Sequence, residues 1–372
     1  MSWLDLIMEQ PPDFERLRTT LPFAAAMADC PQDEIYHGEG DVWTHSMMVV
    51  EALQDDAGFS LLPASRQRVL KFAALLHDIA KPLTTVQEWD EGEQRTRIRQ
   101  PGHARLGARL AWHELAQQGL CRDERLAVYW LIAWHIRAFH LWSAPDMERT
   151  AIRFSLIGNW RELLILANAD NIGRRSPNVT GTAEQLTLLA LWLEEQGLLD
   201  RPFPFAGANS MREYLEKPGR SPHYAAQEAK GSRVVVLAGL PGAGKDSYAQ
   251  RQFRQMPVVS LDAIRDQLGF SPEDNQGRVI QAAFDTAREH LRARRDFVWN
   301  ATNVTASRRE KIISLARAYD AHVAIHVIDP PFATVLRQNR SRERMVPEQV
   351  IENLARKWEP PSVLEAHEVV WV

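Results

Sequence analysis

The sequence predicts two domains of different fold class, an all-α domain in the N-terminal half and an α/β domain with a parallel sheet in the C-terminal half. The length of 372 residues suits two domains of ordinary size. Before about residue 200 the apolar residues recur at helical spacing, whereas after residue 231 short apolar runs alternate with helical segments. Residues 202–231 are rich in proline and glycine and have no sustained periodicity, so we expect them to be a linker.

Helices are expected throughout the N-terminal half, where no clear strand pattern occurs. Four residues at helical spacing form one apolar face: Val69, Phe72, Ala73 and Leu76. The segment 126–136 is apolar almost all round, which predicts a buried helix. Another face repeats the helical spacing but ends on a carboxylate where an apolar residue is expected: Leu163, Leu166, Ala167 and Asp170.

Short apolar runs in the C-terminal half are expected to be the strands of a parallel sheet. They are residues 234–238, 257–260, 297–300, 322–328 and 369–372. Runs of this length between helical segments are typical of the α/β class. We therefore assign residues 1–201 to the helical domain, 202–231 to the linker and 232–372 to the α/β domain.

The composition is that of a globular protein, with 45% hydrophobic and 25% charged residues. Two cysteines, Cys30 and Cys121, are too few for a disulfide framework or a cysteine-built zinc site, and they suit a reducing compartment. No apolar stretch reaches the ~18 residues of a membrane helix. The first residues have neither the basic region nor the cleavage pattern of a signal peptide, so we expect a cytoplasmic protein.

Histidines and aspartates in the helical half predict a metal site. They are His45, the adjacent pair His77 and Asp78 at the end of an apolar helix, and Asp170 inside an apolar face. Imidazole and carboxylate ligands together suit Mn, Fe, Co, Ni or Zn, and they leave positions open for water and a phosphate oxygen. A buried Asp170 would carry a heavy desolvation cost, which a divalent cation offsets. Each residue alone could be an ordinary core or surface residue, so the ordered set carries the prediction.

Residues 37–175 resemble the HD-domain phosphohydrolase superfamily. The segment HGEGDVWTHS (37–46) is similar to the HD region attached to some bacterial tRNA nucleotidyltransferases, and LLHDIAKP carries the HD signature. In such a site the metal lowers the pKa of a bound water and polarises a phosphoryl oxygen. The resemblance implies that a first metal is held by His45, His77, Asp78 and Asp170.

A second metal is implied by the members of this superfamily that have additional histidines. His103 and His135 are the candidates here, with Asp78 bridging the two ions. His103 could instead be an ordinary residue at a helix N-terminus. Lys81 is expected either to contact the substrate phosphate or to be a solvated lysine favoured by the dipole at a helix C-terminus.

A phosphate-binding loop is predicted after the first strand of the C-terminal half. Residues 239–247 read GLPGAGKDS and should lead into a helix. The glycines let backbone N–H groups converge on the phosphates, and the lysine reaches the β- and γ-phosphate oxygens. We expect seven residues to hold the nucleotide: Gly239, Gly242, Ala243, Gly244, Lys245, Asp246 and Ser247. Because Asp246 replaces the usual Ser or Thr, the magnesium ligand is either Asp246, directly or through water, or Ser247.

An acceptor site is expected after the second predicted strand. Asp262 can take a proton from an acceptor hydroxyl, and Arg265, one turn later, can hold an acceptor phosphate. The alternative is a plain aspartate N-cap with a surface arginine. Farther on, four arginines form either a lid over the transferred phosphoryl group or a solvated charged face: Arg337, Arg340, Arg342 and Arg344.

From about residue 233 onward the chain resembles the polynucleotide 5′-kinase branch of P-loop phosphotransferases. The resemblance implies that Lys245 binds phosphates, that Asp262 is the general base on a 5′-hydroxyl, and that Arg265 grips the terminal phosphodiester of the acceptor. It also implies a catalytic lid arginine among Arg340, Arg342 and Arg344. The Asp-Thr-Asn motif of this branch reads Ala-Thr-Asn at 301–303, so we expect Asn300 to replace the missing aspartate that orients the arginine.

The two halves together resemble the bacterial bifunctional end-healing enzymes. This resemblance implies removal of a 2′,3′-cyclic phosphate, 2′-phosphate or 3′-phosphate and phosphorylation of a 5′-hydroxyl. Both reactions prepare RNA or DNA ends for a ligase, which is the implied partner. The implied cofactors are ATP or another nucleoside triphosphate with Mg²⁺, and one or two divalent transition metals, which would be Mn, Ni, Co, Zn or Fe.

Two other classes stay open at this point. One is an HD nucleotidase fused to a P-loop kinase for nucleosides or nucleotides, and the other is a nucleotide-sensing regulatory protein with a degenerate HD half. The net charge of −4 is divided unevenly, because residues 1–200 carry −9 and residues 201–372 carry +5. Neither half has the strongly basic surface of a protein that binds long duplexes. Contact with nucleic acid is therefore expected to be confined to strand ends.

Overall fold

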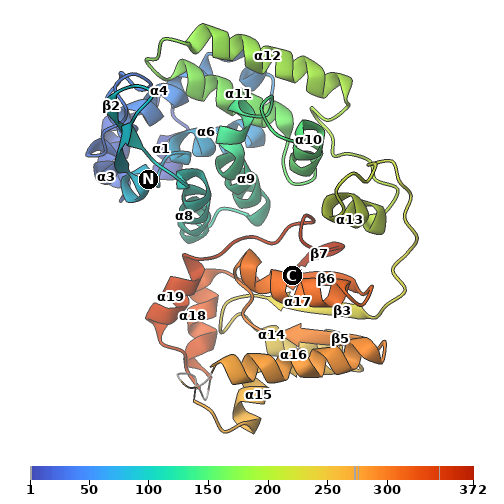
Figure 1. Cartoon of the computed structure of the whole chain (residues 1–372). Helices are drawn as coiled ribbons and strands as arrows, with labels where there is room; N and C mark the ends of the chain where they lie inside the picture. The colour runs from blue at the N-terminus through green and yellow to red at the C-terminus, as the bar shows by residue number, and fades with distance from the viewer. Residues whose placement is uncertain (1, 272–273, 275, 343) are drawn as a thin grey trace. The chain divides into compact units, whose positions relative to one another are not determined.

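The computed structural model of the chain describes residues 2–271, 274, 276–342 and 344–372. It divides into two units, the first ending at Phe203 and the second beginning at Pro204. The first unit is helical apart from one short hairpin, and the second is a sheet with helices (Figure 1). The all-α and α/β classes expected for the two halves are thus confirmed. No helix among the described residues has the length and apolar character needed to cross a membrane.

Helices that pack against one another form the core of the first unit. They are α4 (Val42–Gln54), α6 (Ala64–Leu76), α8 (His103–Gln117), α9 (Arg122–Phe139) and α11 (Trp160–Ile172). The unit is completed by α1 (Trp3–Leu6), α2 (Phe14–Thr20), α3 (Ala24–Ala28), α5 (Ala57–Ser60), α7 (Lys81–Thr84), α10 (Met147–Ser155) and α12 (Val179–Glu195). Every residue of α6 from Val69 to Leu76 is buried, so this helix carries the His77–Asp78 pair into the interior.

Local capping interactions set where the ligand-bearing helices begin. The Asp41 carboxylate accepts a hydrogen bond from the backbone N–H of Thr44 at 2.8 Å, which starts α4 one turn before His45. Asn159 accepts from the N–H of Glu162 at 3.1 Å and starts α11. These caps set the first residue of each helix, and therefore the helical turn on which its ligand lies.

The hairpin of the first unit was not expected from the sequence. Strand β1 (Val86–Asp90) pairs antiparallel with β2 (Arg95–Arg99). Its residues are mostly polar and lie at the surface, so no alternation of apolar and polar residues marks it. Charge pairs hold it instead, since the guanidinium groups of Arg97 and Arg99 lie 3.1 and 3.0 Å from the Asp90 carboxylate.

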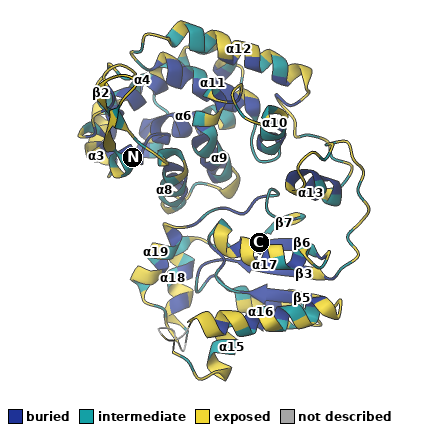
Figure 2. Ribbon diagram, in the orientation of Figure 1, coloured by how far each residue is buried: buried dark blue, intermediate teal, exposed yellow. Residues whose placement is uncertain are grey.

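The second unit contains a five-stranded parallel sheet in the order β4-β5-β3-β6-β7. The strands are β3 (Arg233–Ala238), β4 (Val258–Ser260), β5 (Phe297–Asn300), β6 (His322–Val327) and β7 (Glu368–Trp371), which confirms the five predicted runs. The accompanying helices are α13 (Ala208–Glu216), α14 (Lys245–Gln252), α15 (Leu261–Gln267), α16 (Gln276–Arg292), α17 (Ala306–Arg317), α18 (Phe332–Arg340) and α19 (Glu348–Ala355). Strands β3, β5 and β6 are mostly buried, and α16 exposes a polar face (Figure 2).

The parallel order places the predicted kinase residues at one edge of the sheet. Strands β3, β4 and β5 end at Ala238, Ser260 and Asn300, and the phosphate-binding loop and α15 follow the first two directly. Ligands of open parallel sheets bind beyond the carboxyl ends of the strands. The topology therefore brings the loop, Asp262 and Asn300 to the same edge.

The expected linker contains a helix. Helix α13 lies within residues 202–231 and buries the side chains of Met211, Tyr214 and Leu215. The Arg212 guanidinium donates to the backbone carbonyl of Val363 at 2.9 Å, so this helix is fastened to the second unit. The three apolar residues do lie at helical spacing, but a single turn between proline-rich flanks is too short a signal for a helix.

Candidate metal centre and phosphate-binding site

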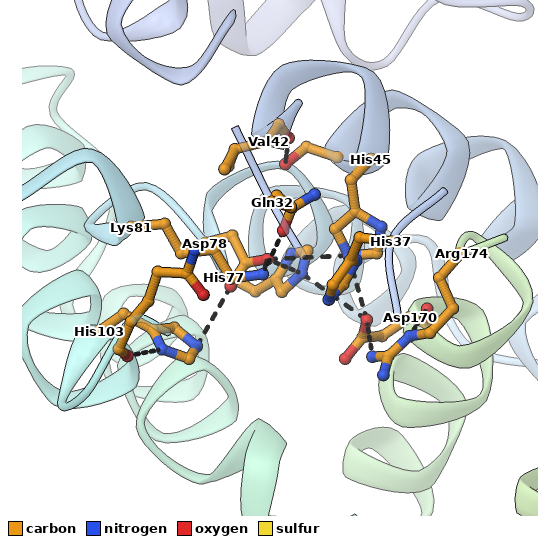
Figure 3. Close-up of polar contacts among 12 residues, drawn as sticks. Gln32, His37, Val42, His45, His77, Asp78, Lys81, His103, Asp170 and Arg174 are labelled. Atoms are coloured by element: carbon orange, nitrogen blue, oxygen red, sulfur yellow. Dashed lines mark hydrogen bonds and ion pairs between the residues drawn. The ribbon is translucent and has the colours of Figure 1, made fainter. Parts of the chain in front are cut away.

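All six predicted metal ligands lie together in two groups inside the first unit. The first group is His45, His77 and Asp170, and the second is Asp78, His103 and His135. Within each group the ligand atoms lie within 4.8 Å of one another. The ligands come from α4, α8, α9 and α11 and from the turn that follows α6. Figure 3 shows five of them, His45, His77, Asp78, His103 and Asp170, around the site.

Asp78 connects the two groups. One carboxylate oxygen, Oδ2, lies 3.1 Å from Nε2 of His77, and the other, Oδ1, lies 3.3 Å from Nε2 of His103 and 3.8 Å from Nε2 of His135. On the other side of the site, Nε2 of His45 lies 3.1 Å from Oδ1 of Asp170. A carboxylate with one oxygen on each group is placed to bridge two cations.

The histidines are oriented so that Nε2 points into the site. The Nδ1 atoms of His77, His103 and His135 donate to the backbone carbonyls of the residues three positions earlier, at 2.7–2.8 Å. This assigns the proton to Nδ1 and leaves a lone pair on Nε2. The Nε2 atoms of His103 and His135 then face each other at 3.3 Å without a proton between them.

Unpaired buried atoms also fit a metal. Nε2 of His77 and Oδ1 of Asp78 are both buried and have no hydrogen-bond partner. Buried polar groups without a partner are costly, and facing lone pairs repel one another. A divalent cation in each group would satisfy these atoms, and the donor set of imidazole and carboxylate suits a transition metal.

The electrostatics of the site favour anionic carboxylates and a neutral His135. Although burial opposes ionisation, His77 and Lys81 hold the pKa of Asp78 well below its usual range, and Arg174 with His45 does the same for Asp170. Burial, helped by the neighbouring histidines, lowers the pKa of His135 to about 3. The pKa of His45 is raised, because hydrogen bonds to Asp170 and Glu39 outweigh its burial.

Lys81 is neither solvated nor at a helix C-terminus, so that alternative is wrong. Helix α6 ends before it, and Lys81 is the first residue of α7. Its buried ammonium group lies 2.6 Å from Oδ2 of Asp78 and donates to Oε1 of Gln32 at 2.6 Å. The cation is therefore held at the metal site, beside the carboxylate that bridges the two groups.

Other residues at the site were missed by the sequence analysis. They are Gln32, His37, Glu39 and Arg174. His37 and Glu39 belong to the HGEGD segment. The sequence shows only that a histidine and an acidic residue lie two positions apart between glycines. Arg174 pairs with Asp170 one turn later on the chain, a spacing that charge patterning could have flagged.

The phosphate-binding loop of the second unit has the backbone that its glycines permit. Gly242 and Gly244 have φ of 84° and 97°, values that favour glycine. Lys245 begins α14, and its ammonium donates to the carbonyls of Gly239 and Leu240 at 2.9 Å each. The lysine is thus folded over the loop, where the phosphates of a nucleotide would lie.

Replacing Gly242 by alanine is expected to impair nucleotide binding. A Cβ there would lie 2.8 Å from the carbonyl oxygen of Val335 and 3.1 Å from Cβ of Asn339, on α18. We expect Gly242→Ala to weaken nucleotide binding at least tenfold, about 1.4 kcal/mol, as measured by calorimetry. Gly219→Ala is the matched control, because Gly219 also has positive φ but open space around it. Equal losses in the two variants would contradict this account.

The residues expected to bind the acceptor, Asp262, Arg265 and Asn300, have different partners. Ser260, not Asp262, caps α15, because its hydroxyl accepts from the N–H of Ala263 at 3.3 Å; the N-cap alternative for Asp262 is therefore wrong. The Asp262 side chain is largely exposed, and Arg265 donates to its carboxylate. Asn300 does not contact Arg265 as expected; its side-chain amide donates instead to Oδ1 of Asp246, one of the two candidate magnesium ligands, at 2.5 Å.

The lid arginines differ in their partners. Arg340 lies 2.7 Å from Glu348, and Arg344 pairs with Asp266. The charge of Arg342, in contrast, acts on Lys245. Burial lowers the pKa of Lys245 to about 8, the carboxylates of Asp246 and Asp262 raise it, and Arg342 lowers it further. The remaining arginine of the cluster, Arg337, donates to the Thr334 hydroxyl at 3.3 Å.

Comparison with protein families matches each unit to a different domain. Residues 42–171 match the family described as HD domain, and residues 234–361 match the family described as AAA domain. All six residues of the His/Asp groups lie within the HD match, and the phosphate-binding loop lies within the AAA match.

Individual relatives match only part of their own length. The chain is 21% identical over 136 residues to L-seryl-tRNA(Sec) kinase of Methanococcus maripaludis, covering 35% of this chain and 53% of that protein. It is 34% identical over 125 residues to the Multifunctional CCA protein of Halorhodospira halophila, covering 33% of this chain and 26% of that protein. The chain thus spans about half and about a quarter of these relatives.

Two solved structures are similar at low scores. One is the Pnkp1/Rnl/Hen1 complex, with 17% identity, a TM-score of 0.28, and coverage of 37% of this chain and 46% of that chain. The other is a gluconokinase from Sinorhizobium meliloti 1021, with 17% identity, a TM-score of 0.28, and coverage of 39% and 83%.

Proposed function

We propose that the chain is a bifunctional end-healing enzyme for nucleic acids. Its HD unit would remove a 2′,3′-cyclic phosphate, 2′-phosphate or 3′-phosphate, and its P-loop unit would phosphorylate a 5′-hydroxyl. The observation that carries the proposal is the pairing, in one chain, of a two-group His/Asp cluster with a P-loop after β3 and an aspartate, Asp262, after the next strand along the chain, β4. One site is suited to removing a phosphate and the other to adding one. Both reactions are needed to prepare the two ends of a broken strand for ligation.

The HD unit would use its six ligands to hold one or two divalent metals. When bound, the metal would supply a water of lowered pKa and polarise the phosphoryl oxygen. Asp78 would bridge the two ions, because it has one carboxylate oxygen on each group. Lys81 would place a positive charge next to the substrate phosphate, since its ammonium is buried beside Asp78.

The P-loop unit would use a nucleoside triphosphate with Mg²⁺. The loop N–H groups and Lys245 would hold the phosphates, and Asp246, oriented by Asn300, would hold the magnesium directly or through water. Asp262 would accept the proton of the 5′-hydroxyl, which its exposure allows a substrate to reach. Arg265 would leave Asp262 to grip the terminal phosphodiester when the acceptor binds.

Arg342 is expected to be the lid arginine. Its charge already acts on Lys245, whereas Arg340 and Arg344 are engaged by Glu348 and Asp266. We expect Arg342→Ala to lower kcat for phosphoryl transfer about 10²–10³-fold with little change in KM. This pattern follows from the loss of a charge that stabilises the transition state but not the bound substrate. Arg344→Ala is the control and should have a small effect. A larger loss in Arg344→Ala than in Arg342→Ala would overturn this assignment.

The proposal is tested with one oligonucleotide substrate. An RNA with a 5′-hydroxyl and a 2′,3′-cyclic phosphate is incubated with Mn, Ni or Co, with and without ATP, and both ends are analysed. We expect phosphate removal at one end and labelling at the other, after which an RNA ligase seals the products. Parallel reactions with nucleosides and nucleotides test the fused nucleotidase and small-molecule kinase. Phosphate transfer to nucleosides alone would refute the repair function.

A further inference from the structure

Glu39 is a buried carboxylate next to the metal cluster that has no role in the scheme above. Its side chain has no exposed surface, although it lies in the turn before α4. One oxygen, Oε1, accepts from Nδ1 of His37 at 2.8 Å and lies 3.0 Å from Nδ1 of His45. The other, Oε2, accepts the backbone N–H of Arg175 at 2.8 Å. The carboxylate thus connects the ligand His45 to His37 and to the backbone of Arg175, five residues after Asp170.

His45 is supported differently from the other ligand histidines. Nδ1 of His77, His103 and His135 donates to the backbone carbonyl of the residue three positions earlier. Nδ1 of His45 lies between the carbonyl of Gly173, at 3.2 Å, and the carboxylate of Glu39. His45 is thus the ligand whose second nitrogen faces a charged side chain, and its Nε2 faces Asp170 across the ring (Figure 3).

The nitrogen atoms around the Glu39 carboxylate, Nδ1 of His37, Nδ1 of His45 and the backbone N–H of Arg175, are placed to donate to it. Burial alone would favour the neutral acid, but hydrogen bonds from His37, His45 and the Arg175 N–H hold the pKa of Glu39 below its ordinary value. An anionic carboxylate behind an imidazole fixes its proton on the near nitrogen and makes the far nitrogen a better electron donor. The near nitrogen here is Nδ1 of His45, and the far one points to the metal position.

Glu39 also joins the two chain segments that carry the first group of ligands. The turn before α4 is bonded to the segment that follows α11, because the N–H of Gly38 donates to the carbonyl of Arg175 at 2.9 Å. A Cβ on Gly38 would lie 3.1 Å from that carbonyl oxygen, so the two segments are in close contact. Next along the chain, Arg174 pairs with Asp170. Contacts at Glu39 therefore bear on the relative positions of His45 and Asp170.

We propose that Glu39, oriented by His37, is a positioning residue that fixes the tautomer and direction of His45 toward the metal. The inference rests on the proposed metal-dependent hydrolase, because it assigns a role at that same site. We expect the negative charge of the side chain at position 39, rather than its shape, to determine how tightly the metal is bound. Aspartate at this position keeps the charge with one methylene fewer, whereas glutamine keeps the shape without the charge.

The test is metal binding by the full-length chain with Glu39→Gln and Glu39→Asp. Co²⁺ is titrated and followed by its visible absorption spectrum and by calorimetry, and circular dichroism checks the fold. We expect Glu39→Gln to bind Co²⁺ 10–100-fold more weakly than the natural protein, as for loss of other partners behind metal-binding histidines. Glu39→Asp is expected to recover part of that loss. Glu162→Gln is the matched control, since Glu162 is a buried carboxylate paired with Arg66 in the same unit.

The outcomes separate this inference from the proposed function. If Glu39→Gln binds Co²⁺ as tightly as Glu162→Gln, or more tightly than Glu39→Asp, Glu39 has only a structural role and the inference is wrong. If the natural protein binds no Co²⁺ or Mn²⁺, both the metal-dependent hydrolase and this inference fail. Should Glu39→Gln not fold, His37→Asn takes its place. This variant should lower Co²⁺ affinity with the fold intact, and unchanged affinity would overturn the inference.

Discussion

His77→Ala and Asp78→Ala are each expected to abolish removal of the terminal phosphate while sparing the kinase. His77 offers an Nε2 atom that has no other partner, and Asp78 contacts both ligand groups, so either change dismantles the metal centre. We expect a fall of at least 10³-fold, equivalent to ~4 kcal/mol of activation free energy. The kinase should persist because its residues lie in a unit with its own sheet.

The measurement is made on one preparation of each variant. Hydrolysis of a 2′,3′-cyclic phosphate, phosphorylation of a 5′-hydroxyl, and bound transition metal are determined side by side. His113→Ala is the control, because His113 is on the same helix as His103 but belongs to neither ligand group. Loss of kinase activity from folded His77→Ala protein would contradict the two-site scheme. Retention of hydrolysis without bound metal would contradict the metal centre.

The fold was predictable because each half repeats one kind of pattern. Buried strands read as continuous apolar runs, and each predicted run became a strand within about two residues. Elements with few buried apolar residues gave no such signal. The hairpin at 86–99 is held by arginine–carboxylate pairs, and α13 buries only one turn of apolar side chains.

The candidate site was predictable where chemistry is encoded in residue type and order. The ordered histidines and aspartates identified the ligands, and the glycine-rich loop identified the phosphate site. Glu39 and Gln32 could not be found this way, because a polar residue in a loop gives no sign of whether it is buried. The lid arginines could not be told apart either, since their carboxylate partners come from other helices.

Lys245→Ala is expected to abolish the kinase and to spare phosphate removal. Lys245 is the residue whose ammonium lies over the loop, 2.9 Å from two of its carbonyls, where the β- and γ-phosphates of a nucleotide would bind. We expect a fall in phosphoryl transfer of at least 10³-fold, or ~4 kcal/mol. Lys230→Ala, at an exposed position of the same unit, is the control. A kinase that survives in Lys245→Ala would place the nucleotide elsewhere.

The pH dependence of nucleotide binding provides a second check on this lysine. Burial lowers the pKa of Lys245 to about 8 in the nucleotide-free protein, so its positive charge is present below that pH and is lost as the pH rises through it. Because the charged form attracts the phosphates, we expect nucleotide affinity to fall as the pH rises above about 8. In Lys245→Ala this fall should be absent, since no titrating ammonium remains. Calorimetric titrations with a non-hydrolysable nucleotide at several pH values measure the difference, and an identical decline in both proteins would assign it to another group.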